Sequence, residues 1–597
     1  MRIKFILSVF AIVWLSLLVR VYSISIQSNA YYDELANRNT IKTKYVAPIR
    51  GEILDRNKKP LAINQLGFRI KFAPHLSSEK KFHLLEEELD LLVKYIPHLD
   101  KATLLKSYKQ KDSHYNHKFI NLVNFIAYED ILPVYSRLNL RTNLRLEPAP
   151  KRYYPYGELS AHVLGYVAKA NRKDIDKDHV VKMTGFTGKN GVEKFYNTYL
   201  EGESGYRQIK VSAYNEEIDE LKNVPPIENR NLVLSIDIEL QKFIKKQFGK
   251  ETGVAVVMNT KGAVLAAISL PEYDLNTFVS GISYKKWQEL ISDVNAPFTN
   301  KLINGLYPPG SVIKTGLGLI YITSGLIGPW NQFDCSGSYE LGKRNFRCWK
   351  STGHHETNIV KAIRESCDDY FYKGSMKVGI ATMSKHLKRY GLGKKTGIDL
   401  PNEFIGTIPN KVWKMKKYNQ RWVTGETLNS SIGQGDTLVT PIQMAQFTAL
   451  MATGKLPIPH LAYEVGDEIY EPEPVDVLND DEKKRLPLIR KAMRDVCAAP
   501  KGTALNFMQT DITVAGKTGT AQVVGISQET KKRLKEHELA YFKRSHAWFT
   551  TFAPYKNPEY IVTILVEHGG HGGKAAAPMA SKIYEWLYDH KYLKHRR

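Results

Sequence analysis

The sequence carries a serine and a lysine at a spacing that suits nucleophilic catalysis. Ser311 follows the run Pro308-Pro309-Gly310, which favours a turn, and Lys314 lies three positions further along an apolar stretch. Residues at this spacing share one face of a helix. A hydroxyl is a weak nucleophile, and a lysine held neutral by burial can act as its base. The helix N-terminus would add a positive field where an oxyanion forms.

Ser-x-x-Lys alone is a weak signal. The same pattern occurs, in polar and lysine-rich surroundings that we interpret as protein surface, at Ser77, Ser78 and Ser283. Two further motifs follow Ser311 in order. Residues 366–368 (Ser-Cys-Asp) precede an aromatic segment, and residues 517–519 (Lys-Thr-Gly) follow a strand-like run at 512–515. This ordered set is typical of penicillin-recognising serine enzymes.

The resemblance to this family covers nearly the whole chain. Residues 228–590 resemble the transpeptidase domain of penicillin-binding proteins, and the preceding region resembles the pedestal of the class B, monofunctional members. The supporting segments are residues 50–56, 154–155, 162–166, 191–196, 234–241, 271–274, 431–435 and 440–445. Asp368, where division-type members usually carry asparagine, and the cysteine-rich stretch before it are similar to the elongation type, penicillin-binding protein 2.

The resemblance implies acyl transfer on peptidoglycan during cell-wall elongation and cell-shape maintenance, with β-lactams as inhibitors and no cofactor needed for the chemistry. Ser311 would attack the penultimate D-alanine of a stem peptide, and Lys314 would accept its proton. Ser366 would relay a proton to the leaving D-alanine. Backbone N–H groups of Ser311 and Thr520 would form the oxyanion hole. An amine from a second stem peptide would complete the cross-link.

The third motif is expected to bind the substrate's terminal carboxylate. Lys517, beside Gly519 and with the hydroxyls of Thr518 and Thr520, would hold it by charge-assisted hydrogen bonds. The aspartate at position 368 leaves one question open. It can pair as a charge with either Lys314 or Lys517, and so the sequence does not decide which lysine is neutral.

Other functions stay open beside transpeptidation. Water in place of the acceptor amine would make a D,D-carboxypeptidase or a β-lactam-hydrolysing relative. Glu426 lies between the second and third motifs, where some β-lactamases place a water-activating glutamate, but its spacing differs by one residue and we interpret it as structural. A third hypothesis is a structural activator of a glycosyltransferase of the shape, elongation, division and sporulation (SEDS) family, with catalysis secondary.

Three of the four cysteines lie within 33 residues, close to the second motif. Three thiolates and one imidazole make a complete tetrahedral zinc set, here Cys335, Cys348, His354 and Cys367. Some penicillin-binding protein 2 members are similar in carrying zinc here, with aspartate at some positions, which makes Asp334 a reserve ligand. The alternative is a Cys335–Cys348 disulfide, expected in an oxidising compartment, with Cys367 a buried thiol. The fourth cysteine, Cys497, is expected in the core.

The elements around the motifs predict an α+β fold. Strand-like runs at residues 253–258 and 263–268 read as a hairpin, and residues 547–552 and 560–566 read as two strands near the other end. A helix-rich middle separates these pairs, and therefore both ends should share one antiparallel sheet flanked by helices. A final helix is expected at residues 578–590. We expect an anchor at 1–26, an elongated α+β pedestal at 27–228 and the transpeptidase domain at 229–597.

The N-terminus predicts a single-pass membrane protein. Arg2 and Lys4 precede an apolar run, and the long side chain of Arg20 can reach the membrane surface, which extends the run to residue 26. No small-x-small cleavage site follows, which favours an uncleaved anchor in the bacterial inner membrane with the rest in the periplasm. The formal charge is +24, but nucleic-acid-binding motifs are not found. Expected partners are stem peptides, β-lactams, a SEDS glycosyltransferase and the elongation complex.

Overall fold

The computed structural model describes residues 2–27, 40–212, 217–228, 230–523 and 536–594. The chain divides into two compact units. One consists of Met1–Gly51, Ala170–Phe186 and Thr198–Arg230, and the other of Glu52–Lys169, Thr187–Asn197 and Asn231–Arg597. Residue 229, at the boundary expected from the sequence, and residues 28–39, in the expected pedestal, lie outside the described residues. The domain boundaries stay a prediction.

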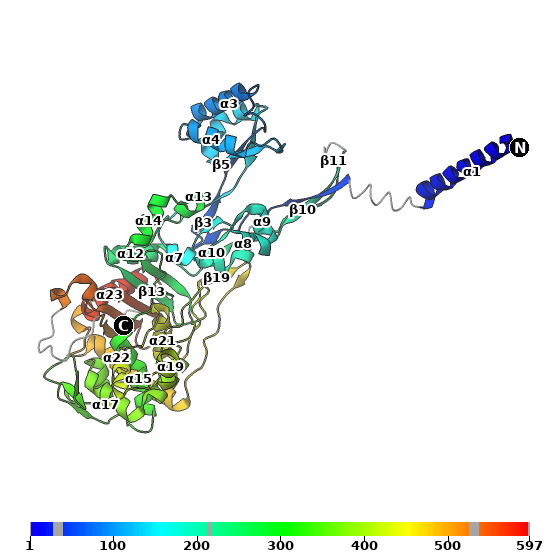
Figure 1. Cartoon of the computed structure of the whole chain (residues 1–597). Coiled ribbons are helices and arrows are strands. Elements are labelled where there is room, and N and C mark those ends of the chain that lie inside the picture. Colours follow the sequence, from blue (N-terminus) through cyan, green and yellow to red (C-terminus); the bar gives the residue numbers. More distant parts are fainter. Residues whose placement is uncertain (1, 28–39, 213–216, 229, 524–535, 595–597) are drawn as a thin grey trace. The chain divides into compact units, whose positions relative to one another are not determined.

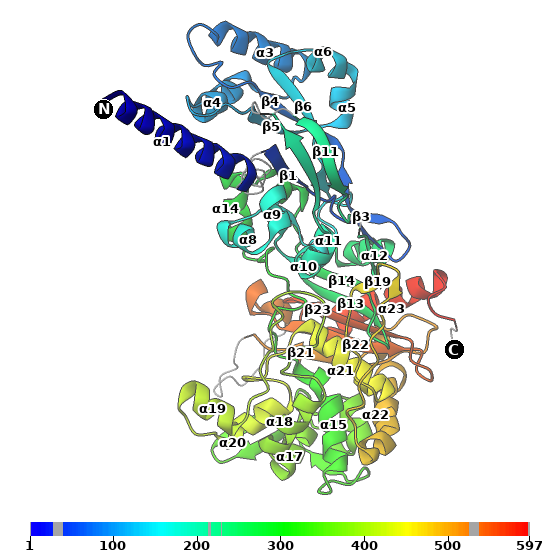
Figure 2. The same cartoon turned by 90° about the vertical axis from the view of Figure 1, so that its right-hand side faces the viewer.

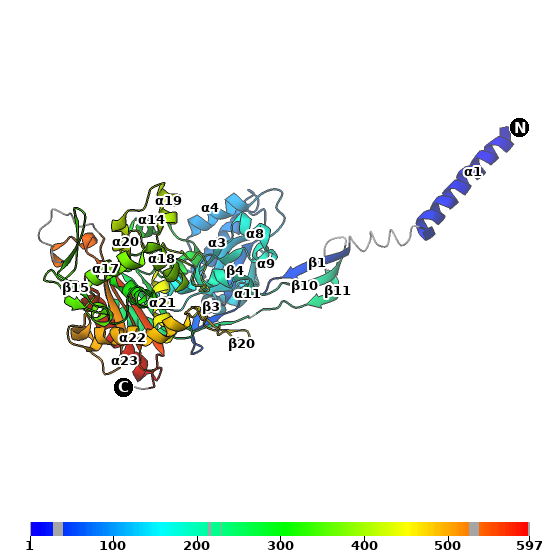
Figure 3. The same cartoon turned by 90° about the horizontal axis from the view of Figure 1, so that it is seen from below.

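The smaller unit contains the apolar N-terminal helix and a three-stranded sheet. Helix α1 (Arg2–Tyr22) continues into a π-helical turn, and the stretch Arg2–Ile26 is apolar and long enough to cross a membrane. Strands β1 (Ile41–Val46), β10 (Gly205–Val211) and β11 (Glu217–Val224) pair in antiparallel fashion and lie side by side (Figure 3). The unit also has two short helices, α8 (Arg172–Lys177) and α9 (His179–Thr184).

The larger unit contains a five-stranded antiparallel sheet, in which β13 is labelled in Figure 1. The strand order is β14-β13-β23-β22-β21, and Figure 2 labels all five strands. Its strands are β13 Gly253–Asn259, β14 Val264–Leu270, β21 Ala515–Ala521, β22 His546–Ala553 and β23 Tyr560–Val566. The expected hairpin is confirmed as β13–β14. Pairing of β13 with β23 confirms that the two ends of the region share one sheet.

Helices cover both faces of this sheet, which explains why β13 and β14 are almost entirely buried. Helices α12 (Ile238–Phe248) and α23 (Gly572–Asp589) contact each other and the sheet, and α21 (Pro441–Thr453) packs on β13, β22 and β23. The final helix begins six residues earlier than expected. The segment before Pro578 holds three consecutive alanines, which favour helix and extend α23 towards its N-terminus.

A helical lobe next to the sheet carries the first two motifs. Its main elements are the 3₁₀ turn η3 Gly310–Ile313, α15 Lys314–Thr323, α16 Ile359–Arg364, α17 Asp368–Val378, α18 Ile380–Arg389, α19 Lys411–Tyr418, α20 Thr424–Ser431 and α22 Asp480–Ala498. Two small hairpin-like pairs complete it: β15 Phe333–Cys335 with β18 His355–Thr357, and β16 Ser338–Leu341 with β17 Arg344–Arg347.

Two further sheets belong to the larger unit. One has the order β20-β19-β12-β2-β3-β7, so that strands early and late in the sequence lie side by side. Its strands are β2 Ile53–Leu54, β3 Pro60–Gln65, β7 Lys151–Tyr153, β12 Leu232–Leu234, β19 Ala462–Val465 and β20 Glu468–Ile469. The other pairs β4 (Gly67–Phe72) with β5 (Ile120–Ala127) and β6 (Leu144–Pro148).

The sheet β5-β4-β6 shares its own hydrophobic core with α3 (Phe82–Tyr95) and α4 (Lys101–Lys111). Figure 2 labels these helices and strands. Residues 78–95 carry charges on one side of a helical repeat, so the sequence favours a helix over that range. The helix begins at Phe82 instead, because residues 78–81 form a turn in which the Lys81 N–H donates to the Ser78 carbonyl. The core of this lobe is separate from that of the catalytic sheet.

Candidate active site

Ser311 lies in the 3₁₀ turn η3, and α15 begins at Lys314. The sequence predicts that a regular helix begins at Ser311. The first turn is instead 3₁₀, in which side chains three residues apart lie directly above one another, so the expected pairing of faces is retained. Ser311 is partly exposed, whereas Lys314 is fully buried. The serine expected to act as nucleophile is therefore accessible, and the lysine expected to act as its base is enclosed.

Gly310 fixes the turn that presents Ser311. Its φ is +55°, in the left-handed region that favours glycine, and its N–H donates to the Gly433 carbonyl at 2.9 Å. A Cβ at this position would lie 2.8 Å from the Thr520 carbonyl oxygen on β21. The indole of Trp548 on β22 donates to the Pro308 carbonyl at 3.0 Å. The turn is thus held against the strand that carries the third motif.

The Lys314 amine reaches the second motif directly. Its Nζ donates to Asp368 Oδ1 at 2.6 Å, to the Ser366 carbonyl at 3.0 Å and, more weakly, to Ser366 Oγ at 3.5 Å. The Phe371 ring lies 5.3 Å away and adds a cation–π contact. No hydrogen bond joins Lys314 to the Ser311 hydroxyl within the described residues. The carboxylate that the sequence could place beside either lysine therefore contacts Lys314.

Ser366 and Asp368 are held by a strained turn at the start of α17. Ser366 has φ +57°, a left-handed conformation that costs a residue with a Cβ about 1 kcal/mol or more. Asp368 is the first residue of α17, and its Oδ2 accepts the Trp349 N–H at 2.9 Å. Both carboxylate oxygens are therefore engaged, one by Lys314 and one by the backbone.

The Lys-Thr-Gly motif lies inside β21, not after a strand as expected, because pairing with β22 supplies the strand and begins only at Ala515. Lys517 is fully buried, and its Nζ donates to the Thr518 carbonyl at 2.9 Å. Burial, with the nearby positive charge of Lys314, holds the pKa of Lys517 well below its usual value. The Thr518 hydroxyl shares a 2.6 Å hydrogen bond with Thr503.

The three motifs meet in one place. Gly519 and Thr520 of β21 lie against the Ser311 turn, since a Cβ at Gly519 would be 3.1 Å from the Pro309 carbonyl oxygen. Lys314 joins that turn to the second motif. The sequence did not predict the supporting contacts of Trp349 and Phe371, whose positions depend on tertiary packing. Gln434, which donates to the Thr520 carbonyl at 3.3 Å, lies in the matching segment at residues 431–435 and could have been found there.

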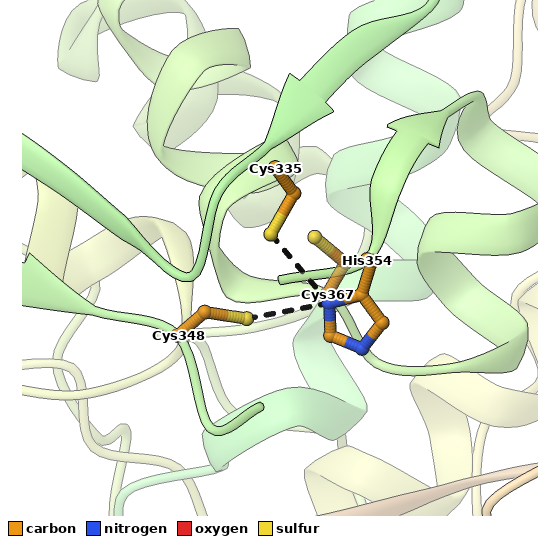
Figure 4. Close-up of side chains that lie close together, drawn as sticks. All are labelled: Cys335, Cys348, His354 and Cys367. Carbon is orange, nitrogen blue, oxygen red and sulfur yellow. Dashed lines mark hydrogen bonds between the residues drawn. The ribbon is translucent and has the colours of Figure 1, made fainter. Parts of the chain in front are cut away.

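The four expected metal ligands converge in a buried cluster. Ligand atoms of Cys335, Cys348, His354 and Cys367 all lie within 4.8 Å of one another (Figure 4). His354 Nδ1 is 3.6 Å from Cys335 Sγ and 3.5 Å from Cys348 Sγ. A tetrahedral zinc ion with ordinary Zn–S and Zn–N bonds requires about 3.6 Å between sulfur and nitrogen. The donor set and its spacing therefore fit zinc.

The other cysteine predictions have mixed outcomes. Asp334, the reserve ligand, is exposed and lies outside the cluster; its strand directs Cys335 inwards and Asp334 outwards, because side chains alternate along a strand. All four cysteines are free thiols, so the alternative disulfide between Cys335 and Cys348 is not formed. Cys497 is buried in α22, as expected, and burial raises its pKa to about 12.

The structural interpretation of Glu426 agrees with its contacts. Its Oε2 accepts the Val423 N–H at 2.9 Å in a cap of α20, and its Oε1 pairs with the buried Lys414. Ser283, one of the surplus Ser-x-x-Lys serines, likewise caps a helix, α14 (Tyr284–Ser292). These helix caps and the ion pair give both residues a structural role.

Two domain-family matches define the class of protein. Residues 253–585 match the penicillin-binding protein transpeptidase domain, and residues 45–234 match the penicillin-binding protein dimerisation domain. The first match alone covers more than half of the chain. Fold and site together are those of a penicillin-binding transpeptidase with an attached dimerisation domain.

Individual relatives narrow this class. A Salmonella typhimurium protein named peptidoglycan D,D-transpeptidase MrdA is 34% identical, over 96% of this chain and 93% of its own. Penicillin-binding protein 2 of Helicobacter pylori, solved in complex with MreC, is 42% identical, with a TM-score of 0.85 over 93% of this chain and 99% of its own. The chain belongs to the class B penicillin-binding proteins, of the penicillin-binding protein 2 type.

A third similar solved structure is that of a larger complex. It is described as the structural coordination of polymerization and crosslinking by a peptidoglycan synthase complex. The matched chain is 25% identical, with a TM-score of 0.70, over 98% of this chain and 97% of its own.

Proposed function

We propose that this chain is a peptidoglycan D,D-transpeptidase that cross-links stem peptides through an acyl-enzyme on Ser311. The observation that carries the proposal is the contact of Lys314 with Ser366 and Asp368 beneath the Ser311 turn, which itself lies against β21. The relatives named peptidoglycan D,D-transpeptidase support the substrate class.

In the proposed acylation, Ser311 Oγ attacks the carbonyl carbon of the penultimate D-alanine. Lys314 takes the hydroxyl proton, and Asp368, whose Oδ1 lies 2.6 Å away, stabilises the ammonium that results. Ser366, whose Oγ lies 3.5 Å from Lys314 Nζ, relays this proton from Lys314 to the leaving amino group as the bond to the terminal D-alanine breaks. The amine of a second stem peptide then attacks the acyl carbonyl, forms the cross-link and restores the Ser311 hydroxyl.

The strand side is proposed to bind the negative end of the donor. Lys517 has a lowered pKa because its charge is buried beside that of Lys314, and an incoming carboxylate would favour the ammonium form again. The same strand, β21, also carries the hydroxyls of Thr518 and Thr520 and the backbone of Gly519. Backbone N–H groups of Ser311 and Thr520 would stabilise the oxyanion. Binding of the donor and charging of Lys517 are thus coupled.

The cysteine cluster is proposed as a structural zinc site held by Cys335, Cys348, His354 and Cys367. Zinc there would supply folding energy and rigidity. Cys367 lies between Ser366 and Asp368, and the Asp368 N–H points to Cys348 Sγ at 3.4 Å, so the cluster supports the turn that holds Lys314. Metal analysis of the purified protein, with a count of reactive thiols before and after denaturation, tests the site. One equivalent of zinc is expected.

We propose that α1 is a single-pass anchor in a bacterial inner membrane, with the catalytic unit in the periplasm. Arg2 and Lys4 precede the apolar stretch, which supports a cytoplasmic N-terminus. The relatives solved with MreC and in a peptidoglycan synthase complex support partners of the elongation machinery. A membrane glycan polymerase of the SEDS family is the proposed partner for activation as well as for supply of new strands.

A coupled assay tests the proposal against its alternatives. Purified full-length protein is given a D-Ala-D-Ala stem peptide as donor and a second stem peptide as acceptor, and products are separated by mass. A cross-linked dimer with release of D-alanine is expected, and neither forms with Ser311→Ala. Release of D-alanine without dimer would make the chain a carboxypeptidase. Normal wall synthesis in cells that carry Ser311→Ala would favour the activator hypothesis.

A further inference from the structure

Two surface segments beside the active site are strongly basic. Residues 343–350 and 411–421 together hold nine lysines and arginines and no acidic residue. The first runs through β17 and the second through α19. We call these two segments the basic rim. The chain as a whole contains both basic and acidic residues. Two segments with basic residues alone therefore indicate a local preference for an anionic ligand.

The basic rim is joined to the elements that hold the nucleophile. In the first segment, Phe346 packs with Tyr372 of α17 and Leu428 of α20. The neighbouring Trp349 donates its backbone N–H to Asp368 and its indole N–H to the Glu365 carbonyl. A polymer that enters the site from this side would therefore cross the rim first.

The second segment reaches the same place through α20, which follows α19 (Figure 2). Trp422, the residue that follows this segment, donates its indole N–H to Thr427 of α20 at 2.9 Å. Beyond the end of α20, the Gly433 carbonyl accepts the N–H of Gly310, the residue before Ser311. Both segments of the rim are thus one or two contacts from the reacting groups.

Three of the basic residues in the second segment form no ion pair within the described residues. Lys414 is buried and pairs with Glu426, but Lys416, Lys417 and Arg421 are exposed and form no ion pair within the described residues. Lys417 Nζ lies 5.0 Å from the ring centres of both Trp413 and Tyr418. The Tyr418 and Trp349 side chains are 45% and 53% exposed. Charges and aromatic faces are therefore presented together.

We propose that the basic rim is a binding site for the peptidoglycan strand beyond the reacting peptide: an amino-sugar polymer whose stem peptides end in carboxylates. Exposed aromatic faces suit the C–H faces of sugar rings, and lysine and arginine suit free carboxylates. Each uncross-linked stem presents such a carboxylate, so substrate that has not yet reacted binds better than cross-linked product. The inference rests on the proposed function, because it takes the reacting polymer as the ligand.

The test compares binding of soluble, uncross-linked glycan strands by the full-length protein in detergent. The rim variant carries Lys416→Gln, Lys417→Gln and Arg421→Gln. The control variant loses the same charge through Lys80→Gln, Lys106→Gln and Lys118→Gln on the separate β5-β4-β6 lobe. The rim variant is expected to bind strands about tenfold more weakly at low salt, with a smaller loss at high salt, because exposed charges are screened. The control should bind like the unmodified protein.

Penicillin acylation keeps this test separate from the proposed function. All three proteins should be acylated at equal rates, since none of the changed residues contacts the reacting groups. Absence of acylation in every protein would contradict the proposed function. Equal strand binding by both variants, with normal acylation, would overturn the proposal for the basic rim and leave the proposed function standing. Tyr418→Leu should weaken binding to strands stripped of their peptides. A loss confined to vesicles of anionic lipid, with strand binding unchanged, would also overturn the proposal in favour of a membrane contact.

Discussion

The active site contains two fully buried lysines in opposite electrostatic surroundings. On the helical side, Lys314 donates to the carboxylate of Asp368. On the strand side, the hydrogen bond found for Lys517 among the described residues is to a backbone carbonyl, and its pKa is held well below the usual value. The comparison teaches that two equally buried lysines can have different partners, a carboxylate for Lys314 and a backbone carbonyl for Lys517. This difference fits the roles proposed for the two residues, which are proton transfer for Lys314 and binding of the substrate carboxylate for Lys517.

The largest expected effect comes from removing the paired lysine. Lys314→Met removes the base and leaves the Asp368 carboxylate buried without its cation, so we expect acylation by penicillin to fall about 10³-fold. Loss of one partner of a buried ion pair should also lower the free energy of unfolding by about 3 kcal/mol. Stopped-flow acylation and thermal denaturation measure the two effects.

Lys517→Met is the matched change on the strand side. Acylation by penicillin, which carries a carboxylate, should fall about 10²-fold. The free energy of unfolding should rise by about 1 kcal/mol at neutral pH, because a buried amine without an acidic partner is replaced by an apolar side chain of similar size. A loss of stability equal to that of Lys314→Met would contradict the comparison.

His162 extends the comparison to a buried base outside the site. It is 2% exposed, and burial lowers its pKa to about 4. The unfolded chain binds a proton below about pH 6.5 whereas the folded chain does not, so stability is lost as pH falls from 6.5 to 4. The loss should approach ~3 kcal/mol for this group. Denaturant titrations across that range should show a shallower pH dependence in His162→Gln, and an unchanged slope would contradict this assignment.

Asp368→Asn should have the smallest effect on acylation. The amide oxygen can still accept a hydrogen bond from Lys314, but the charge that stabilises the ammonium is lost. We expect acylation to fall about tenfold, since a charged hydrogen bond exceeds a neutral one by about 1 kcal/mol or a little more. Acylation kinetics check this value, and a fall as large as that of Lys314→Met would mean that the carboxylate acts as more than a partner.

Much of this site could be predicted from the sequence, because its chemistry is concentrated in short motifs. The three motifs, the hairpin β13–β14 and the convergence of the four metal ligands follow from residue types and spacing. The partner of Asp368 could not be predicted, because it depends on how α17 packs beside α15. The left-handed Ser366 and the position of Phe371 under Lys314 arise from the same packing.

Errors in the predicted elements have physical causes. The strand expected before Lys517 contains it instead, because pairing with β22 overrides the low strand propensity of Gly516 and Gly519. Asp334 lies outside the cysteine cluster because neighbouring residues of a strand point to opposite sides. Periodicity described the local pattern, whereas tertiary contacts set the boundaries.

The most direct test of the account is the site of acylation by a fluorescent penicillin. Full-length protein is labelled, digested and mapped by mass spectrometry. We predict one stable acyl group on Ser311, no labelling of Ser311→Ala and strongly slowed labelling of Lys314→Ala, with both variants folded by circular dichroism. An adduct on another residue, or undiminished labelling of Ser311→Ala, would contradict the assignment of Ser311 as the nucleophile.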